Sequence, residues 1–337
     1  MKQNNKVVQF LLRTAKALVI PVGMWLLFAI ISGGRTASLK MFRNTLRQSV
    51  VPCIICYGLM LNMSVGMMNF SAGGMMIFAG IIGGNLAKMT NTGVPGLLLF
   101  IIAICVLEGM VTGLLYNAMR VPCIVLSIGM MLIWEALPRV IFEGGLNLTY
   151  QWTFLARNPY CFIILLACML VFYIIYNKTS FGHNLRAIGS NQAIANSVGL
   201  DSDKIKFKSF TIGSLFLGIA AVLYMSERGE VRNVPTMGSM TIMMDGFMGM
   251  FIAMFLSKYC DMSIAVVFGT FTMKMLSNGF VALGLSATVR DIVQGLVLLL
   301  LLVISANAGF FEQRKEDKIF AEECNREYGN QKDSAVI

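Results

Sequence analysis

Ionisable side chains that interrupt long apolar segments are the first candidates for chemistry in this 337-residue chain. A charge in hydrocarbon is costly, so such a residue typically contacts a substrate or has a partner. Glu135 and Arg139 stand four residues apart, the spacing at which helical side chains meet, and we expect them to form an ion pair. Asp245 and Lys274 are expected to neutralise each other between two helices. For these residues and for Glu108, contact with a substrate is the alternative.

The sulfur-containing residues do not point to a metal or redox centre. Cys53 and Cys56 form a C-x-x-C pair inside an apolar segment, but the chain has a single histidine, His183, and no acidic residue accompanies the pair. Methionine can bind copper, yet the 26 methionines form no cluster with a cysteine or histidine at matched spacing. Packing explains both groups better. Because the acids are also scattered, we expect no enzymatic activity, no metal and no cofactor in this chain.

The composition indicates a membrane protein. Hydrophobic residues make up 57% of the chain and charged residues 13%, whereas soluble domains carry about 25% charged residues. The net charge is +10, but the basic residues gather at the ends of apolar segments, as expected beside membrane lipid rather than nucleic acid. The sequence therefore predicts an all-α polytopic membrane protein.

Apolar segments of sufficient length predict about ten transmembrane helices. Their expected ranges are 17–34, 49–67, 70–87, 94–117, 122–142, 159–177, 208–226, 240–257, 262–281 and 287–306. The uncharged run from Ser49 to Ala87 is nearly twice as long as one crossing requires. It must cross twice, with an uncharged turn near Asn69.

An even number of spans places both termini on one side, and the distribution of lysine and arginine favours the cytoplasm by roughly three to two. We therefore expect a cytoplasmic N-terminal segment (1–16), a transmembrane domain (17–309) and a polar cytoplasmic tail (310–337). The basic sequence SLKMFRNTLRQS, residues 38–49, falls on the outer side and is an exception to this rule. We expect it to lie flat in the membrane interface, with its Leu and Met face among the lipid headgroups.

The polar segment at about 178–206 contains a predicted short helix. Asn191 is a suitable N-cap and Gly199 a suitable residue just beyond the C-terminus. Ile194 and Val198 lie on one face of this helix, with Ala195 beside them. Such a helix is too short to be stable alone. It either packs on its own membrane domain or docks on a cytoplasmic partner.

Several motifs together resemble those of the permease subunits of ribose-type ABC importers. The run Arg186-Ala187-Ile188-Gly189-Ser190-Asn191, followed by Val198-Gly199-Leu200, is similar to the family's R-A-I-G-G-N and S-G-I. Leu46-Arg47-Gln48-Ser49 resembles its L-R-Q-T/S, and Met68-Asn69-Phe70-Ser71-Ala72-Gly73 its I-D-L-S-V-G. Val121-Pro122 through Ser127-Ile128-Gly129, and Asn278-Gly279 with Leu283-Gly284, also fall at matching places.

The resemblance implies a fold, partners and two sets of site residues. The fold is the ABC importer permease fold of the ribose and vitamin B12 type, in a bacterial inner membrane. The partners are cytoplasmic ATPase subunits, an extracellular or periplasmic substrate-binding protein and a second permease subunit. The residues implied in coupling to the ATPase are Arg186, Gly189, Asn191, Ile194, Ala195, Val198 and Gly199. Those implied in the substrate pathway are Asn69, Ser71, Gly73, Ser127, Asp245 and Asn278.

On this interpretation the chain imports a sugar or a similar small polar solute. It has no G-x-x-x-x-G-K-[ST] motif, so ATP must be bound by the partner subunits. Two departures from the family pattern stand out: Asn69 replaces an aspartate, and Ala253–Leu256 replaces G-G-T-S. Either the substrate differs from ordinary sugars or the chain is half of a heterodimer. The alternatives are an ion-coupled secondary transporter and a degenerate permease that serves only as a structural partner.

Overall fold

The computed structural model describes residues 38–286 except 144 and 233, together with 18, 21–31, 33–34 and scattered positions from 288 to 303. The chain divides into two compact units, Met1–Leu285 and Ser286–Ile337. The labelled helices and strands all belong to the first unit. The predicted segments 1–16 and 310–337 lie outside the described residues, as does half of the predicted span 287–306.

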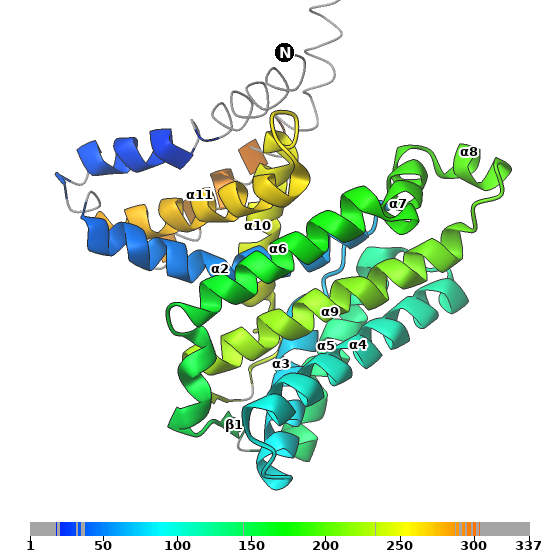
Figure 1. The fold of residues 1–337 in the computed structure, drawn as a ribbon, viewed down its shortest axis with the longest axis horizontal. Helices are drawn as coiled ribbons and strands as arrows, with labels where there is room; N and C mark the ends of the chain where they lie inside the picture. Colours follow the sequence, from blue (N-terminus) through cyan, green and yellow to red (C-terminus); the bar gives the residue numbers. More distant parts are fainter. Residues whose placement is uncertain are drawn as a thin grey trace, which may run out of the picture. The chain divides into compact units, whose positions relative to one another are not determined.

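The described part of the first unit is almost entirely helical (Figure 1). A short apolar helix, Pro21–Ile31, comes first. The labelled elements that follow are α2 (Leu39–Met63), α3 (Ala72–Met89), α4 (Gly93–Met119), α5 (Cys123–Ile141), β1 (Leu146–Asn147), the 3-10 helix η2 (Tyr150–Ala156), α6 (Tyr160–Lys178), α7 (Ser180–Ser190), α8 (Gln192–Ser197), α9 (Ser202–Arg228), β2 (Glu230–Val231), α10 (Met240–Leu256) and α11 (Met262–Ala282).

Seven of the described helices are long and apolar enough to cross a membrane: α2, α3, α4, α5, α6, α9 and α11. Pro21–Ile31 and α10 are apolar but shorter. All of these helices coincide with predicted spans. The all-α polytopic class is therefore confirmed, whereas the number of about ten spans stays a prediction.

The long uncharged run is divided as predicted. α2 ends at Met63 and α3 begins at Ala72, and the connection between them contains Asn69. The seventh span is longer than predicted, because α9 begins at Ser202 rather than near residue 208. Asp201 explains this earlier start, since its side chain accepts a hydrogen bond from the Lys204 backbone N–H and caps the helix.

The prediction of a separate interfacial helix at residues 38–49 is wrong. Ser38 caps α2, which then continues without a break through Met63. Phe42 in its first turns packs on other helices, whereas Leu39 is exposed. The Phe42 ring lies 5.5 Å from that of Phe271 and 6.2 Å from that of Trp25, between centroids.

Helix α9 packs closely against both α2 and α4. α2 and α9 cross where Gly58 and Gly213 face each other; a Cβ on Gly58 would lie 2.7 Å from the Gly213 carbonyl oxygen. α4 lies along α9 with Gly109 against Phe210 and Ser214. Small residues allow membrane helices to approach this closely.

The two ends of α9 carry different structures. α7 and α8 precede its N-terminus and lie together at one end of α6 and α9 (Figure 1). β2 follows its C-terminus and pairs antiparallel with β1, with Leu146 opposite Val231. α2 runs between these two regions, because its C-terminal end contacts α7 at Gly189 and its N-terminal half lies near the C-terminus of α9.

Candidate functional site

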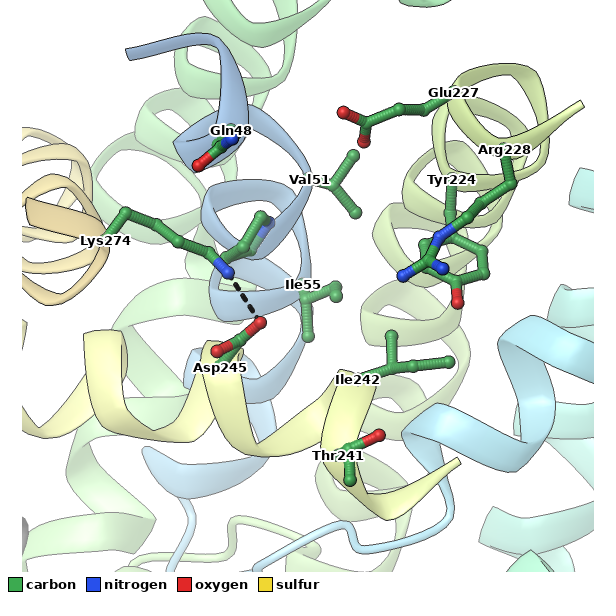
Figure 2. A pocket seen from close by; sticks show the side chains of 11 residues that line it. Gln48, Val51, Ile55, Tyr224, Glu227, Arg228, Thr241, Ile242, Asp245 and Lys274 are labelled. Atoms are coloured by element: carbon green, nitrogen blue, oxygen red, sulfur yellow. Dashed lines mark hydrogen bonds and ion pairs between the residues drawn. The ribbon is translucent and has the colours of Figure 1, made fainter. Parts of the chain in front are cut away.

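A polar cavity of about 400 Å³ lies between α2, α9, α10 and α11, and we call it the central cavity (Figure 2). Figure 2 shows Lys274 and Asp245 on one side and three residues of α9 on the other. The lining residues are Gln48, Val51, Pro52, Ile55, Tyr224, Glu227, Arg228, Thr241, Ile242, Asp245 and Lys274.

The ion pair between Lys274 and Asp245 is confirmed. The Lys274 Nζ lies 2.6 Å from Asp245 Oδ2, and the two side chains are 19% and 35% exposed. Opposite them, the Arg228 guanidinium lies over the Tyr224 ring, 5.2 Å from its centroid. The cavity therefore presents both charge signs, hydroxyl groups and an aromatic face, which suit a small polar solute.

Two features of α2 shape the cavity wall at Gln48. Pro52 has no backbone N–H, so the carbonyl of Gln48 loses its helical donor. The Asn278 side chain donates hydrogen bonds of 2.9 Å to Gln48 Oε1 and to Thr45 Oγ1. Asn278 does not line the cavity itself, but it fixes the orientation of Gln48, which does.

Four of the predicted pathway residues lie elsewhere, around the start of α3. Asn69 Oδ1 accepts hydrogen bonds from the Ser71 backbone N–H at 3.1 Å and from Ser71 Oγ at 2.6 Å. Ser127 Oγ donates to the carbonyls of Ile124 and Met68. All three side chains are buried, and none lines the central cavity. In this conformation they stabilise the turn before α3.

Gly73 brings the starts of α3 and α10 into contact. A Cβ at this position would come 2.2 Å from the Ser239 carbonyl oxygen and 2.9 Å from its carbonyl carbon, so only glycine fits. Two helix N-termini, each carrying partial positive charge, thus lie side by side in the packed interior.

A buried carboxylate from α5 neutralises this junction. Glu135 is 2% exposed, and its two oxygens accept hydrogen bonds of 2.7 Å from the backbone N–H groups of Met237 and Ser239. The prediction that Glu135 pairs with Arg139 is wrong, since Arg139 instead donates to the Val234 carbonyl. The backbone N–H groups at the start of α10 are nearer partners for Glu135, and this long-range contact leaves no pattern in the sequence.

The predicted short helix before Gly199 is confirmed as α8. Asn191 Oδ1 accepts a hydrogen bond of 3.1 Å from the Ile194 backbone N–H, and Gly199 has a φ of +91°. Ile194 and Val198 are 61% and 78% exposed, whereas Ala195 is 5% exposed. α8 therefore buries only Ala195 and leaves an apolar face uncovered.

α7 connects α8 to the membrane helices. Its Leu185 and Ile188 are buried, and Arg186 lies 5.2 Å from the Tyr176 ring centroid. A Cβ on Gly189 would clash with the Ser64 carbonyl at the end of α2. The predicted coupling residues thus lie on or beside α7 and α8. Among them Gly189 contacts the end of α2, the helix whose other half lines the central cavity.

Most of the residues that line the cavity leave no distinctive pattern in the sequence. Gln48 falls within a motif, and the charged pair Glu227-Arg228 stands at a span end, where such residues usually serve as membrane anchors. Glu108 is 2% exposed in α4. Its carboxyl oxygens accept no hydrogen bond from the described residues, and the Cys105 thiol lies beside them.

Known proteins resemble this chain over most of its length. The model of a family described as branched-chain amino acid transport system / permease component matches residues 41–302. The autoinducer 2 import system permease protein LsrC of Photorhabdus luminescens is 24% identical over 232 residues, which are 66% of this chain and 68% of the relative. The ribose import permease protein RbsC of Bacillus subtilis is 22% identical over 297 residues, 84% of this chain and 90% of the relative.

No solved structure gives a significant match. The family match covers well over half of the chain, and the names of the relatives agree with the resemblance seen in the motifs. The chain therefore belongs to this family of transport permease components.

Proposed function

We propose that the chain is the membrane-spanning subunit of an ATP-driven importer that carries a sugar or a similar small polar solute into a bacterial cell. The relatives named for ribose and autoinducer 2 import support this substrate class. The central cavity supports it as well, because its charged, amide and hydroxyl groups provide the donors and acceptors that a polyol needs.

The exposed apolar face of α8 is the observation that carries the proposal. Ile194 and Val198 project from a two-turn helix that has few contacts of its own and is held at one end of the bundle by α7. An exposed apolar helix face of this kind is unfavourable in water unless a partner covers it. The partner is a cytoplasmic ATPase, since this chain has no phosphate-binding loop of its own.

Coupling then follows a short path through α7 and α2. Movement of α8 displaces α7, and Gly189 transmits the displacement to the end of α2 at Ser64. α2 carries Gln48, Val51 and Ile55 in the wall of the central cavity. ATP binding drives transport only if the ATPase contacts α8 differently in the inward and outward states.

This proposal places both termini and α8 in the cytoplasm. The complex further contains a second permease subunit and a substrate-binding protein on the opposite side of the membrane. Asn69, Ser71, Gly73 and Ser127 then belong to the pathway through the α3–α10 junction, which opens when α2 moves.

Substitutions on the exposed face of α8 test the proposal. In Ile194→Asp/Val198→Asp we expect loss of both the co-purifying ATPase and its vanadate-sensitive activity, with the chain still inserted in the membrane. Ile194→Leu/Val198→Ile keeps the surface apolar and is the matched control. Ala195→Trp is unsuitable, because Ala195 is buried within the chain and its enlargement would displace α8 itself. An undiminished ATPase association in the aspartate variant contradicts the proposal.

Glu108 favours one alternative, an ion-coupled transporter. A buried carboxyl group without a hydrogen-bond partner among the described residues is a candidate proton carrier. Proton-driven ribose uptake by vesicles that contain this chain alone, abolished in Glu108→Gln, would establish the alternative. We expect no such uptake.

A further inference from the structure

The basic segment at the start of α2 is the exception to the rule that lysine and arginine gather on the cytoplasmic side. In the structure its cations line a cavity. Lys40, Arg43 and Arg47 recur at intervals of three and four residues and therefore share one face of the helix. With Leu39, Asn44 and Asn158 they line a cavity of about 540 Å³. These cations thus face a hollow of the size of a small molecule, while Phe42 packs on other helices.

This cavity adjoins a second one and, through it, the central cavity. Arg47 also lines a cavity of about 500 Å³ to which Arg157 and Arg228 contribute. Glu227 and Arg228 line both this cavity and the central cavity. We call the first two cavities together the basic groove. It lies at the end of α2 and α9 that is remote from α8.

The described residues that line the first of these cavities include three cations, Lys40, Arg43 and Arg47, and no acid. The acids of the second cavity are Glu227 and Glu230, and Glu230 pairs with Arg232 at 2.9 Å. Lys40, Arg43 and Arg47 form no ion pair within the described residues. Like charges at such helical spacing repel one another, and an anion bound between them would remove that repulsion.

We propose that the basic groove binds the phosphate or carboxylate group of an anionic ligand, so that the transported solute is an acidic sugar derivative rather than a neutral sugar. Arg43 and Arg47 supply planar guanidinium groups, which form paired hydrogen bonds to either kind of anion. Asn44 and Asn158 add amide donors at the same wall. The shared residues Glu227 and Arg228 lead the solute from the groove to the central cavity, where Lys274, paired with Asp245, is the next cation.

The inference rests on the proposed import function for its direction, but binding can be measured without transport. The full chain in phosphatidylcholine nanodiscs is titrated with ribose 5-phosphate and, separately, with ribose. We expect ribose 5-phosphate to bind at least about tenfold more tightly. Raising NaCl from about 50 to 300 mM should weaken only the phosphorylated probe, because salt screens exposed charges. Equal affinity for the two probes overturns the inference. The proposed import function is tested separately by the substitutions Ile194→Asp/Val198→Asp in α8.

Variants locate the binding site. Arg43→Gln/Arg47→Gln is expected to weaken ribose 5-phosphate binding about tenfold or more. Arg120→Gln/Lys208→Gln removes the same charge from exposed positions that line none of the three cavities, and it should bind normally. Both variants must retain the thermal unfolding midpoint of the unchanged chain. Equal binding by both variants overturns the assignment.

A lipid headgroup offers the same phosphate chemistry, so the titration is repeated in nanodiscs of phosphatidylglycerol. Undiminished binding of ribose 5-phosphate there supports a free solute. Loss of binding there, together with phosphatidylglycerol that co-purifies with the unchanged chain but not with Arg43→Gln/Arg47→Gln, identifies a lipid in the groove and overturns the solute assignment. If the double variant instead loses only an acidic substrate-binding protein, with phosphate binding unchanged, the groove is a protein-docking surface and the inference fails.

Discussion

The contact between α3, α5 and α10 allows a sharp test, because the side chain of Glu135 alone supplies its carboxylate hydrogen bonds. Glu135 accepts hydrogen bonds of 2.7 Å from the backbone N–H groups of Met237 and Ser239. Met237 has a φ of +61°, which L-residues rarely adopt, and the bond from its N–H helps to hold it there. Removing the carboxylate therefore affects the buried Ser239 N–H, the more exposed Met237 N–H and one strained backbone position.

The expected loss follows from these two bonds. A buried donor left without an acceptor costs about 1–3 kcal/mol. This cost applies to the Ser239 N–H, whereas Met237 is 44% exposed and its N–H can bond water, so Glu135→Ala should lower the free energy of unfolding by about 1–3 kcal/mol. Glu135→Gln keeps one acceptor oxygen and should lose about half as much. Glu230→Gln is the control: it removes the same charge from an exposed ion pair, which contributes at most about 1 kcal/mol.

Thermal unfolding of the purified chain in detergent, followed by a thiol-reactive dye, ranks the three variants. The chain has eight cysteines, and they report the unfolding because those buried in the described residues include Cys53, Cys56, Cys105, Cys161 and Cys168. We expect Glu230→Gln to have the highest unfolding midpoint, Glu135→Gln an intermediate one and Glu135→Ala the lowest. A midpoint for Glu135→Ala equal to that of Glu230→Gln would refute the role of Glu135 at the start of α10.

Three further predictions concern other contacts. Gly73→Ala should destabilise the chain by about 1–3 kcal/mol because the added methyl group meets backbone atoms, whereas Gly129→Ala, with nothing within 4 Å of its Cβ, should not; equal midpoints would contradict this. Asp245→Asn should cost about 1–3 kcal/mol by leaving Lys274 unpaired, and Asp245→Asn/Lys274→Gln should recover part of it; additive losses would exclude coupling. The Lys204 backbone N–H and ammonium lower the pKa of Asp201, so its capping of α9 is complete above the ordinary carboxyl pKa of 3.8 and is lost as the pH falls through the lowered value. Hydrogen exchange at the start of α9 should therefore accelerate below about pH 4, and less so in Asp201→Asn, since asparagine caps without titrating.

The sequence predicted the features that depend on neighbouring residues. The length of the Ser49–Ala87 run required two crossings, and the spacing of Asn191 and Gly199 predicted both ends of α8. The pairing of Asp245 with Lys274 was also predicted, because both were costly charges in apolar helices. In each case the controlling quantity was local: length, a cap or a desolvated charge.

Features that depend on the packing of distant helices were not predicted. Gln48 and Arg228 share a cavity wall only because α2 crosses α9 at Gly58 and Gly213. Arg139 lies four residues from Glu135 in the sequence, but the residues that bond Glu135 in the fold, Met237 and Ser239, are about a hundred residues away in the sequence. Asn69 was predicted near a pathway, but in this conformation its side chain is used by its own turn.

Site-specific photo-crosslinking from Val198 in intact cells tests the central claim most directly. Val198 is 78% exposed, so a photoreactive amino acid at this position reaches whatever covers α8. We predict one major adduct, with an ATPase that carries a phosphate-binding loop, and its loss when Ile194→Asp is added. Adducts with only this chain, with lipid or with an extracytoplasmic protein would contradict the claim that an ATPase drives transport through α8.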